Sequence, residues 1–215
     1  MAGCCCPVSL DQLDWCGVSV ILRGLTVNHQ GGVGGGIAFN TGGTLHIENC
    51  AVAGFLSSAG VVFIGAGTLE VKDSIMTGNS TGIVIDPSSG TAVATIDHVR
   101  LEGSTHDGLD VESGSKVTIR NSMAFGNGTG FLVLTGSAVA SELNVENCVA
   151  SNNNVGIEAA EVFGAVTVRV SNSTVTGNLT GLSALGTMPS LLSRGNNTVE
   201  GNGNEGSFTG TYIPK

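Results

Sequence analysis

Side chains that could do chemistry gather in one short stretch of the sequence, EGSTHDGLDVE, which runs from Glu102 to Glu112. Between its two glutamates it holds His106, Asp107 and Asp110, although only 12% of all residues are charged. A histidine beside carboxylates is what general acid and base catalysis requires. The stretch is therefore the first candidate for an active site, with His106, Asp107 and Asp110 as candidate catalytic residues.

The elements that must position these residues form a repeat. Short apolar segments such as LHIENCAV, LEVKDSIM and LNVENCVA recur every 24 to 26 residues, and each contains a pivot where the chain is expected to bend. The pivots, which number the coils from one to eight, are Gly24, Asn49, Asp73, Asp97, Asn121, Asn147, Asn172 and Asn196. The unit has strands of about four to six residues, Gly, Asn and Ser turns, and no helical period. We therefore predict an all-β fold, a right-handed, single-stranded parallel β-helix of about eight coils.

A second strand in each coil begins with glycine, as in GIVI, GLDV and GFLV, and alternates inward and outward side chains. The outward row is Ala38, Val62, Val84, Asp110, Leu132, Glu158 and Ser183. Val62, Val84 and Leu132 would form an exposed apolar stripe, which predicts a self-association face unless a loop covers it. Glu158 lies two coils from Asp110, on the order of 10 Å. That distance is near the upper end of the carboxylate spacing in inverting glycosidases, so Glu158 joins the candidate catalytic residues.

The residues just before the pivots form another outward row. They are Arg23, Glu48, Lys72, Ile96, Arg120, Glu146 and Ser171. Charge alternates over the first three and again between Arg120 and Glu146, which predicts an exposed charge ladder worth a few tenths of a kcal/mol per pair. The Asn and Asp pivots suit a tight bend, and stacked Asn side chains can bond to one another along the rod. The turn EGSTHD of coil four is expected to be two residues longer than GNST and GNGT in its neighbours.

Residues 1–17 are expected to form an N-terminal cap, and residues 18–215 the β-helix. SLDQLDW is expected to be a short helix with Ser9 as its N-cap. Four cysteines, Cys4, Cys5, Cys6 and Cys16, lack the paired spacing of a zinc site. Idle thiols, a disulfide and a metal remain open for them, and we predict neither a metal site nor a cofactor. No secretory signal is visible, and the compartment stays open.

Composition narrows the range of possible partners. The net charge is −9 with only eight Lys and Arg, which argues against nucleic acid and makes a polyanionic polysaccharide an awkward substrate. No apolar run approaches the ~20 residues of a membrane span.

The segments SGSKVTIRNSMAFGN and LSRGNNTVEGNGNEGSFTGTY have the style of a known family. From about Val20 to Lys215 the chain resembles the bacterial right-handed parallel β-helix repeat family, which is related in fold to pectate lyases. The resemblance implies the fold and leaves the function open. Of the motifs expected in polygalacturonase-like enzymes, N-T-D, D-D, G-H-G and R-I-K, none occurs. Calcium-dependent pectate lyases need a carboxylate cluster with an Arg or Lys base, and coil four, with Asp86 from the coil before, is the best local imitation.

We predict a non-catalytic binding or structural module that forms a homo-dimer or another homo-oligomer. It would associate through Val62, Val84 and Leu132 or through the first coil. The alternative is a carbohydrate-active enzyme that uses His106, Asp107, Asp110 and Glu158. For coil four itself, a catalytic site, a contact with a cation or a sugar, and a solvated turn all remain open, because a motif without its structural context is only a hypothesis. One Trp and one Tyr leave few rings for sugar stacking.

Overall fold

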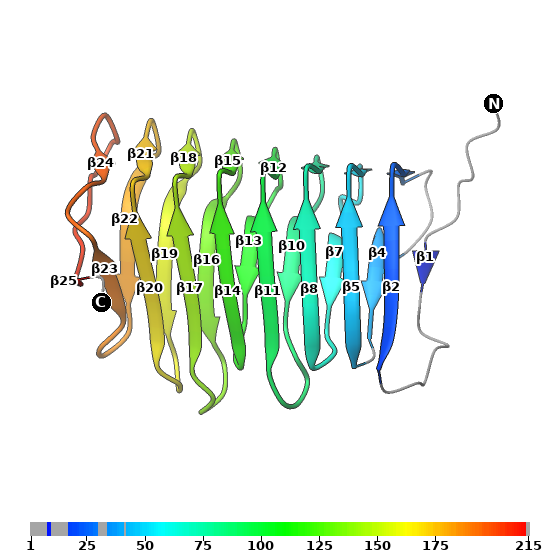
Figure 1. Ribbon diagram of the computed structural model, residues 1–215. Coiled ribbons are helices and arrows are strands. Elements are labelled where there is room, and N and C mark those ends of the chain that lie inside the picture. Colours follow the sequence, from blue (N-terminus) through cyan, green and yellow to red (C-terminus); the bar gives the residue numbers. More distant parts are fainter. Residues whose placement is uncertain (1–7, 10–16, 30–33, 41, 214–215) are drawn as a thin grey trace.

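A computed structural model of the chain describes residues 8–9, 17–29, 34–40 and 42–213 (Figure 1). All regular structure in these residues is β-strand, arranged as three parallel sheets of eight, nine and eight strands. The expected all-β parallel β-helix is therefore confirmed. In the described residues, no helix has the length and apolar character that crossing a membrane requires.

We call the three sheets A, B and C. Each coil runs through one strand of each sheet, in the order B, C, A. Sheet A holds β1 (Val8–Ser9), β4 (Ile37–Phe39), β7 (Ala59–Phe63), β10 (Thr81–Ile85), β13 (Asp107–Val111), β16 (Thr129–Thr135), β19 (Val155–Glu161) and β22 (Thr180–Leu185). Sheet B holds β2 (Val18–Arg23), β5 (Gly43–Glu48), β8 (Gly67–Lys72), β11 (Ala92–Asp97), β14 (Ser115–Arg120), β17 (Ser141–Glu146), β20 (Val166–Ser171), β23 (Ser190–Ser193) and β25 (Gly210–Thr211). Sheet C holds β3 (Thr26–Asn28), β6 (Ala51–Ala53), β9 (Ile75–Thr77), β12 (Arg100–Glu102), β15 (Met123–Phe125), β18 (Val149–Ser151), β21 (Thr174–Thr176) and β24 (Thr198–Val199).

The core is a stack of equivalent side chains from successive coils. Ile83 pairs in register with Leu109, and Leu109 with Phe131, and all three are fully buried. The glycine that precedes each of these positions is required by close approach: a Cβ on Gly108 would lie 2.7 Å from the carbonyl oxygen of Gly130. Glycine at this position therefore lets consecutive coils stack at strand spacing.

Sheets B and C meet at a bend of one residue in the left-handed region. The non-glycine residues there have φ of 49–55° and are Asn49, Asp73, His98, Asn121, Asn147 and Asn172. The pivot of coil four is therefore His98 and not Asp97. Ile96 is fully buried and pairs with Val71, so it is not an outward residue. The expected register was wrong by one residue because His shares with Asn and Asp the ability to adopt a left-handed conformation.

The turn from sheet C to sheet A contains a buried ladder of asparagines, Asn127, Asn153 and Asn178, that extends to Asn202. The backbone N–H and the Nδ2 of Asn127 both donate to Asn153 Oδ1, at 2.9 and 3.0 Å. Asn153 repeats both bonds to Asn178 at 2.9 and 3.0 Å. The pivots form a second, exposed ladder, in which Asn147 Nδ2 donates to Asn121 Oδ1 at 2.7 Å. The predicted stacking of asparagines thus occurs twice in each coil of this region.

At the N-terminal end, Ser9 lies in β1, which pairs in parallel with β4. Residues 10–16, where a short helix was expected, lie outside the described residues, as do Cys4, Cys5, Cys6 and Cys16. Cys50 and Cys148 are buried free thiols. Burial raises the pKa of the Cys148 thiol to about 12, so this cysteine is structural rather than reactive.

Candidate functional site

Asp110 lies on the outer face of sheet A between two apolar neighbours. It pairs in register with Val84 on β10 and with Leu132 on β16, and all three side chains are partly exposed. Val62 continues the row on β7. The predicted apolar stripe is therefore interrupted by a carboxyl group, and its aliphatic side chains shield that group from water.

The carboxyl group of Asp110 is held in its neutral form. Burial raises its pKa to about 8, and the charges of Glu112, Asp107 and Asp86 add to the shift. Its Oδ1 atom is buried and has no hydrogen-bond partner. A buried polar atom without a partner costs about 1–3 kcal/mol, so this side chain is an exception that a functional role would explain.

Three further carboxyl groups share this face. Burial raises the pKa of Asp107, although a hydrogen bond from Thr129 and the charge of His106 act in the opposite direction. Burial also raises the pKa values of Glu112 and Glu158, and the charge of Asp107 raises both further. The structure thus couples the predicted residues Asp107, Asp110 and Glu158, and it adds Glu112 to them.

Glu158 lies two strands from Asp110, because Leu132 pairs with both. Strand spacing places their Cα atoms on the order of 10 Å apart, as expected.

His106 lies at the edge of this group. It is exposed on the turn between β12 and β13, and its Nδ1 is 3.1 Å from Ser80 Oγ and 3.3 Å from Thr105 Oγ1. Its charge influences the neighbouring Asp107. His106 therefore borders the carboxylates without being placed between them.

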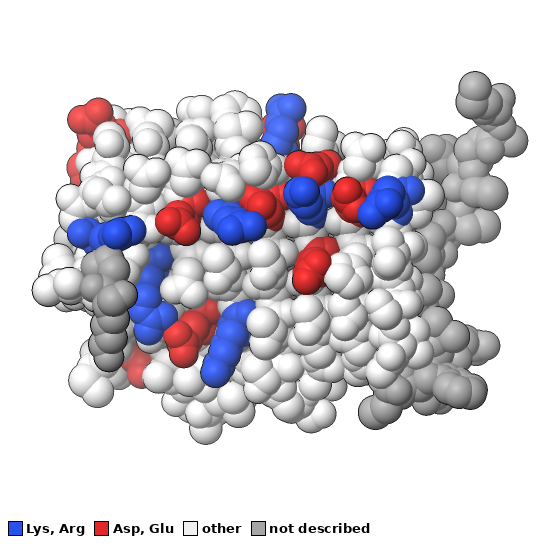
Figure 2. All heavy atoms as spheres, in the orientation of Figure 1, with Lys and Arg blue, Asp and Glu red and all other residues white. Residues whose placement is uncertain are grey.

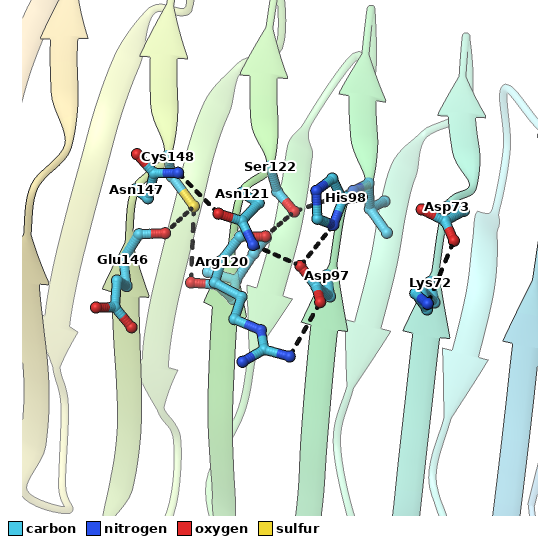
Figure 3. Close-up of polar contacts among 12 residues, drawn as sticks. Lys72, Asp73, Asp97, His98, Arg120, Asn121, Ser122, Glu146, Asn147 and Cys148 are labelled. Carbon is cyan, nitrogen blue, oxygen red and sulfur yellow. Dashed lines mark hydrogen bonds and ion pairs between the residues drawn. The ribbon is translucent and has the colours of Figure 1, made fainter.

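Other charged residues of coil four point elsewhere. Arg100 Nε donates to Glu102 Oε1 at 2.7 Å on sheet C, and His98 Nδ1 lies 2.8 Å from Asp97 Oδ1 at the corner of sheets B and C (Figure 3). The residues that look like one cluster in the sequence are distributed over different faces, since a coil turns the chain around the rod. Neither Arg100 nor Glu102 belongs to the acidic group on sheet A.

The turn that carries His106 is one residue longer than its neighbours, not two. Arg100 and Leu109 are nine positions apart, whereas their register partners Ile75 and Ile83 are eight apart. Ser104 takes the place of asparagine in the buried ladder, and its Oγ has no partner. The extra residue and the short side chain both change the framework directly beside Asp107.

A surface pocket of about 380 Å³ adjoins the acidic group on the side of the turns between sheets A and B. Asp86 and Glu112 line it, together with Pro87, Ser137 and Val139. Sequence reasoning noted Asp86 as a neighbour of coil four but missed the pocket, because turn conformations leave no periodic signal. The acidic group and the pocket together make an acceptor-rich surface.

A metal centre is not formed in the described residues, where no three His, Cys, Asp or Glu side chains are grouped to hold an ion. The acidic group is instead spread along a sheet face, with Asp107 and Asp110 on β13, Glu112 directly after it and Glu158 on β19. Such an arrangement suits a ligand with several hydroxyl donors better than a single cation.

Comparisons with known proteins support the fold and identify no functional residues. A family described as "Right handed beta helix region" matches residues 35–203, which is more than half of the chain. No curated protein and no solved structure matches. The chain therefore belongs to the right-handed β-helix family.

Proposed function

We propose that this protein is a ligand-binding β-helix module whose site is the acidic outer face of sheet A around coil four. The proposed ligand is an uncharged, hydroxyl-rich molecule such as a neutral glycan. The observation that carries the proposal is Asp110, a partly exposed carboxyl group with a pKa of about 8 and a buried, unpartnered oxygen. Strongly perturbed pKa values concentrate at functional sites.

The chemistry of the face selects the ligand class. Neutral Asp110 has one proton to donate, while the carboxyl oxygens of Asp107, Glu112 and Glu158 accept hydrogen bonds from hydroxyl groups. The same carboxylates repel anionic ligands, in keeping with the net charge of −9. Val84 and Leu132 supply apolar contacts on either side of Asp110.

Two substitutions test the site. Binding of neutral oligosaccharides, measured by calorimetry at pH 6 and pH 9, should weaken at the higher pH because Asp110 loses its proton. Asp110→Asn keeps a donor without a charge and should bind at both pH values, whereas Asp110→Ala should not bind. Glu200→Gln, an exposed change outside the face, is the control. Unchanged binding by Asp110→Ala would remove this site.

A second candidate function, hydrolysis of a glycan, is favoured by the spacing of Asp110 and Glu158. A neutral Asp110 would act as general acid and Glu158 as general base, with His106 and Asp107 bordering the reaction. Asp110→Asn separates the two functions, because it keeps the hydrogen-bond donor but has no acidic proton. Retained binding with loss of product release from a labelled glycan would show catalysis; equal product with both proteins would exclude Asp110 as the acid.

Self-association through Val62, Val84 and Leu132 stays a prediction. It would compete with ligand binding, because Asp110 lies between Val84 and Leu132 in that row.

A further inference from the structure

The outer face of sheet B carries a row of six side chains whose charge alternates without a break. We call it the charge row: Arg23, Glu48, Lys72, Asp97, Arg120 and Glu146. Each residue pairs in register with the next, from β2 to β17, and Figure 2 shows the alternating blue and red side chains along this face. The corrected register of coil four completes the row, since Asp97 replaces the buried Ile96.

An alternating row with an even number of members is complementary to itself when it is reversed. We propose that this face binds a second copy of the chain, with the two rods antiparallel and the two-fold axis between β8 and β11. Arg23 then faces Glu146 of the second copy, Glu48 faces Arg120, and Lys72 faces Asp97. A parallel two-fold pairing would place like charges opposite each other in every coil, so the row also selects the orientation.

The rows beside the charge row are compatible with the same reversal. Among the pivots, Asp73 faces His98 of the second copy and Asn49 faces Asn121. On the other side, Glu70 faces Thr95. No like charges meet in these pairs, of which the pivots lie at the corner between sheets B and C.

Apolar residues extend this surface onto sheet C. In the reversed arrangement Met123 faces Ala51 of the second copy, and both are partly exposed. A groove of about 460 Å³ lies here, lined by His98, Arg100, Met123 and Val149 among others. Burial of Ala51, Met123 and Val149 would add the contact area that ion pairs alone do not supply.

Contacts within the chain leave the cations of the row and Glu146 able to bind a partner. Arg23 Nε donates to Glu48 at 2.9 Å and Arg120 to Asp97 at 3.0 Å, but both arginine side chains remain about half exposed or more, at 67% and 49%. Lys72 reaches Asp73 at 3.6 Å and is 57% exposed. Glu146 is exposed and makes no ion pair with any described residue (Figure 3). Each arginine has five N–H donors, so one ion pair does not exhaust it.

The test uses two variants, each of which should dimerise poorly alone, whereas their mixture should form a dimer. Arg23→Glu places two pairs of glutamates opposite each other in its own dimer, and Glu146→Arg places two pairs of arginines. Each variant should therefore dissociate at least about tenfold more readily than the wild type in sedimentation velocity. An equimolar mixture restores opposite charges at both positions and should sediment as a dimer.

Matched controls carry the same charge changes outside the row. Lys116→Glu faces Thr44 of the second copy, Glu200→Arg lies beyond β24, and both should remain dimeric. A monomeric wild type at the highest soluble concentration would overturn the proposal, and so would dimeric single variants or a mixture that stays monomeric. Circular dichroism establishes that each variant is folded. The result is independent of the ligand site, which lies on a different sheet.

Discussion

Coil four and coils five to seven differ in how the buried polar groups of their turns are hydrogen-bonded. In coils five to seven, Asn127, Asn153 and Asn178 satisfy one another in the turn, and Cys148 N donates to Ser173 Oγ beside the pivot at 3.1 Å. Coil four has Ser104 in the first position and Val99 in the second. In the described part of the chain, the two buried side-chain polar atoms without a partner are Ser104 Oγ and Asp110 Oδ1, and both belong to coil four.

Coil four is therefore the place where the chain departs from the hydrogen-bonding pattern of the repeat. A ladder gains when each member bonds to the coil on either side, and an interruption lowers the stability of both neighbours. Departures from such local rules are expected at functional sites, where the rest of the fold supplies the compensating stability. The acidic group on sheet A lies beside the interruption, which strengthens the case that coil four carries the site.

The largest effect is expected from Asp110→Asn, measured as stability against pH. The raised pKa means that the native state holds a proton that the unfolded state has lost above pH 4. Wild-type stability should therefore fall relative to the variant by up to about 1.4 kcal/mol per pH unit between pH 4 and pH 8, and stay level above pH 8. Chemical denaturation at pH 4, 6, 8 and 9 measures the difference, and a pH-independent difference would contradict the neutral Asp110.

Breaking the ladder where it is complete should cost about 3 kcal/mol. Asn153→Ala removes the partner of the Asn127 N–H and of the Ala124 carbonyl in a buried turn, and it leaves the Nδ2 of Asn127 with Leu101 O alone. Asn154→Ala, the exposed neighbour, is the control and should be nearly neutral. Thermal unfolding of the two variants compares them directly, and equal midpoints would show that the ladder does not stabilise these coils.

Restoring the ladder where it is interrupted should stabilise the protein by about 1 kcal/mol. In Ser104→Asn the new side-chain oxygen can accept from Asn79, and Ser104 N already donates to Asn127 Oδ1 at 2.9 Å. Ligand binding should weaken at the same time if the irregular turn shapes the site. A less stable variant would indicate that the extra residue of this turn moves position 104 out of the ladder.

The smallest effect is expected in the charge row. Burial alone would raise the pKa of Asp97, but the hydrogen bond from Asn121 and the charges of Arg120 and His98 outweigh it and lower the pKa. Asp97→Asn should therefore cost about 0.5 kcal/mol at pH 7, and the loss should shrink as the pH falls through the lowered pKa. Urea denaturation at pH 7 and pH 3 checks this, with Glu200→Gln as an exposed control outside the row.

Sequence periodicity predicted the fold and the face of most strand residues. The inward positions Leu109 and Val111 are fully buried, and Asp110 and Glu158 share one outward row, as expected. The error at His98 arose at a bend, where residue preference rather than alternation had to set the register. The pocket beside Asp86 could not be predicted because it depends on how unequal turns pack, which no repeat encodes.

The sequence by itself determined a parallel β-helix, because a 24–26-residue period of strands and turns leaves few other ways to bury its apolar side chains. Only the tertiary structure decided which charged residues meet. Glu102, close to Asp107 in the chain, turns away to Arg100, while Glu158 from two coils further on joins the acidic face. The physical reason is that a coil sends neighbouring residues to different faces, whereas stacking aligns residues about 24 positions apart.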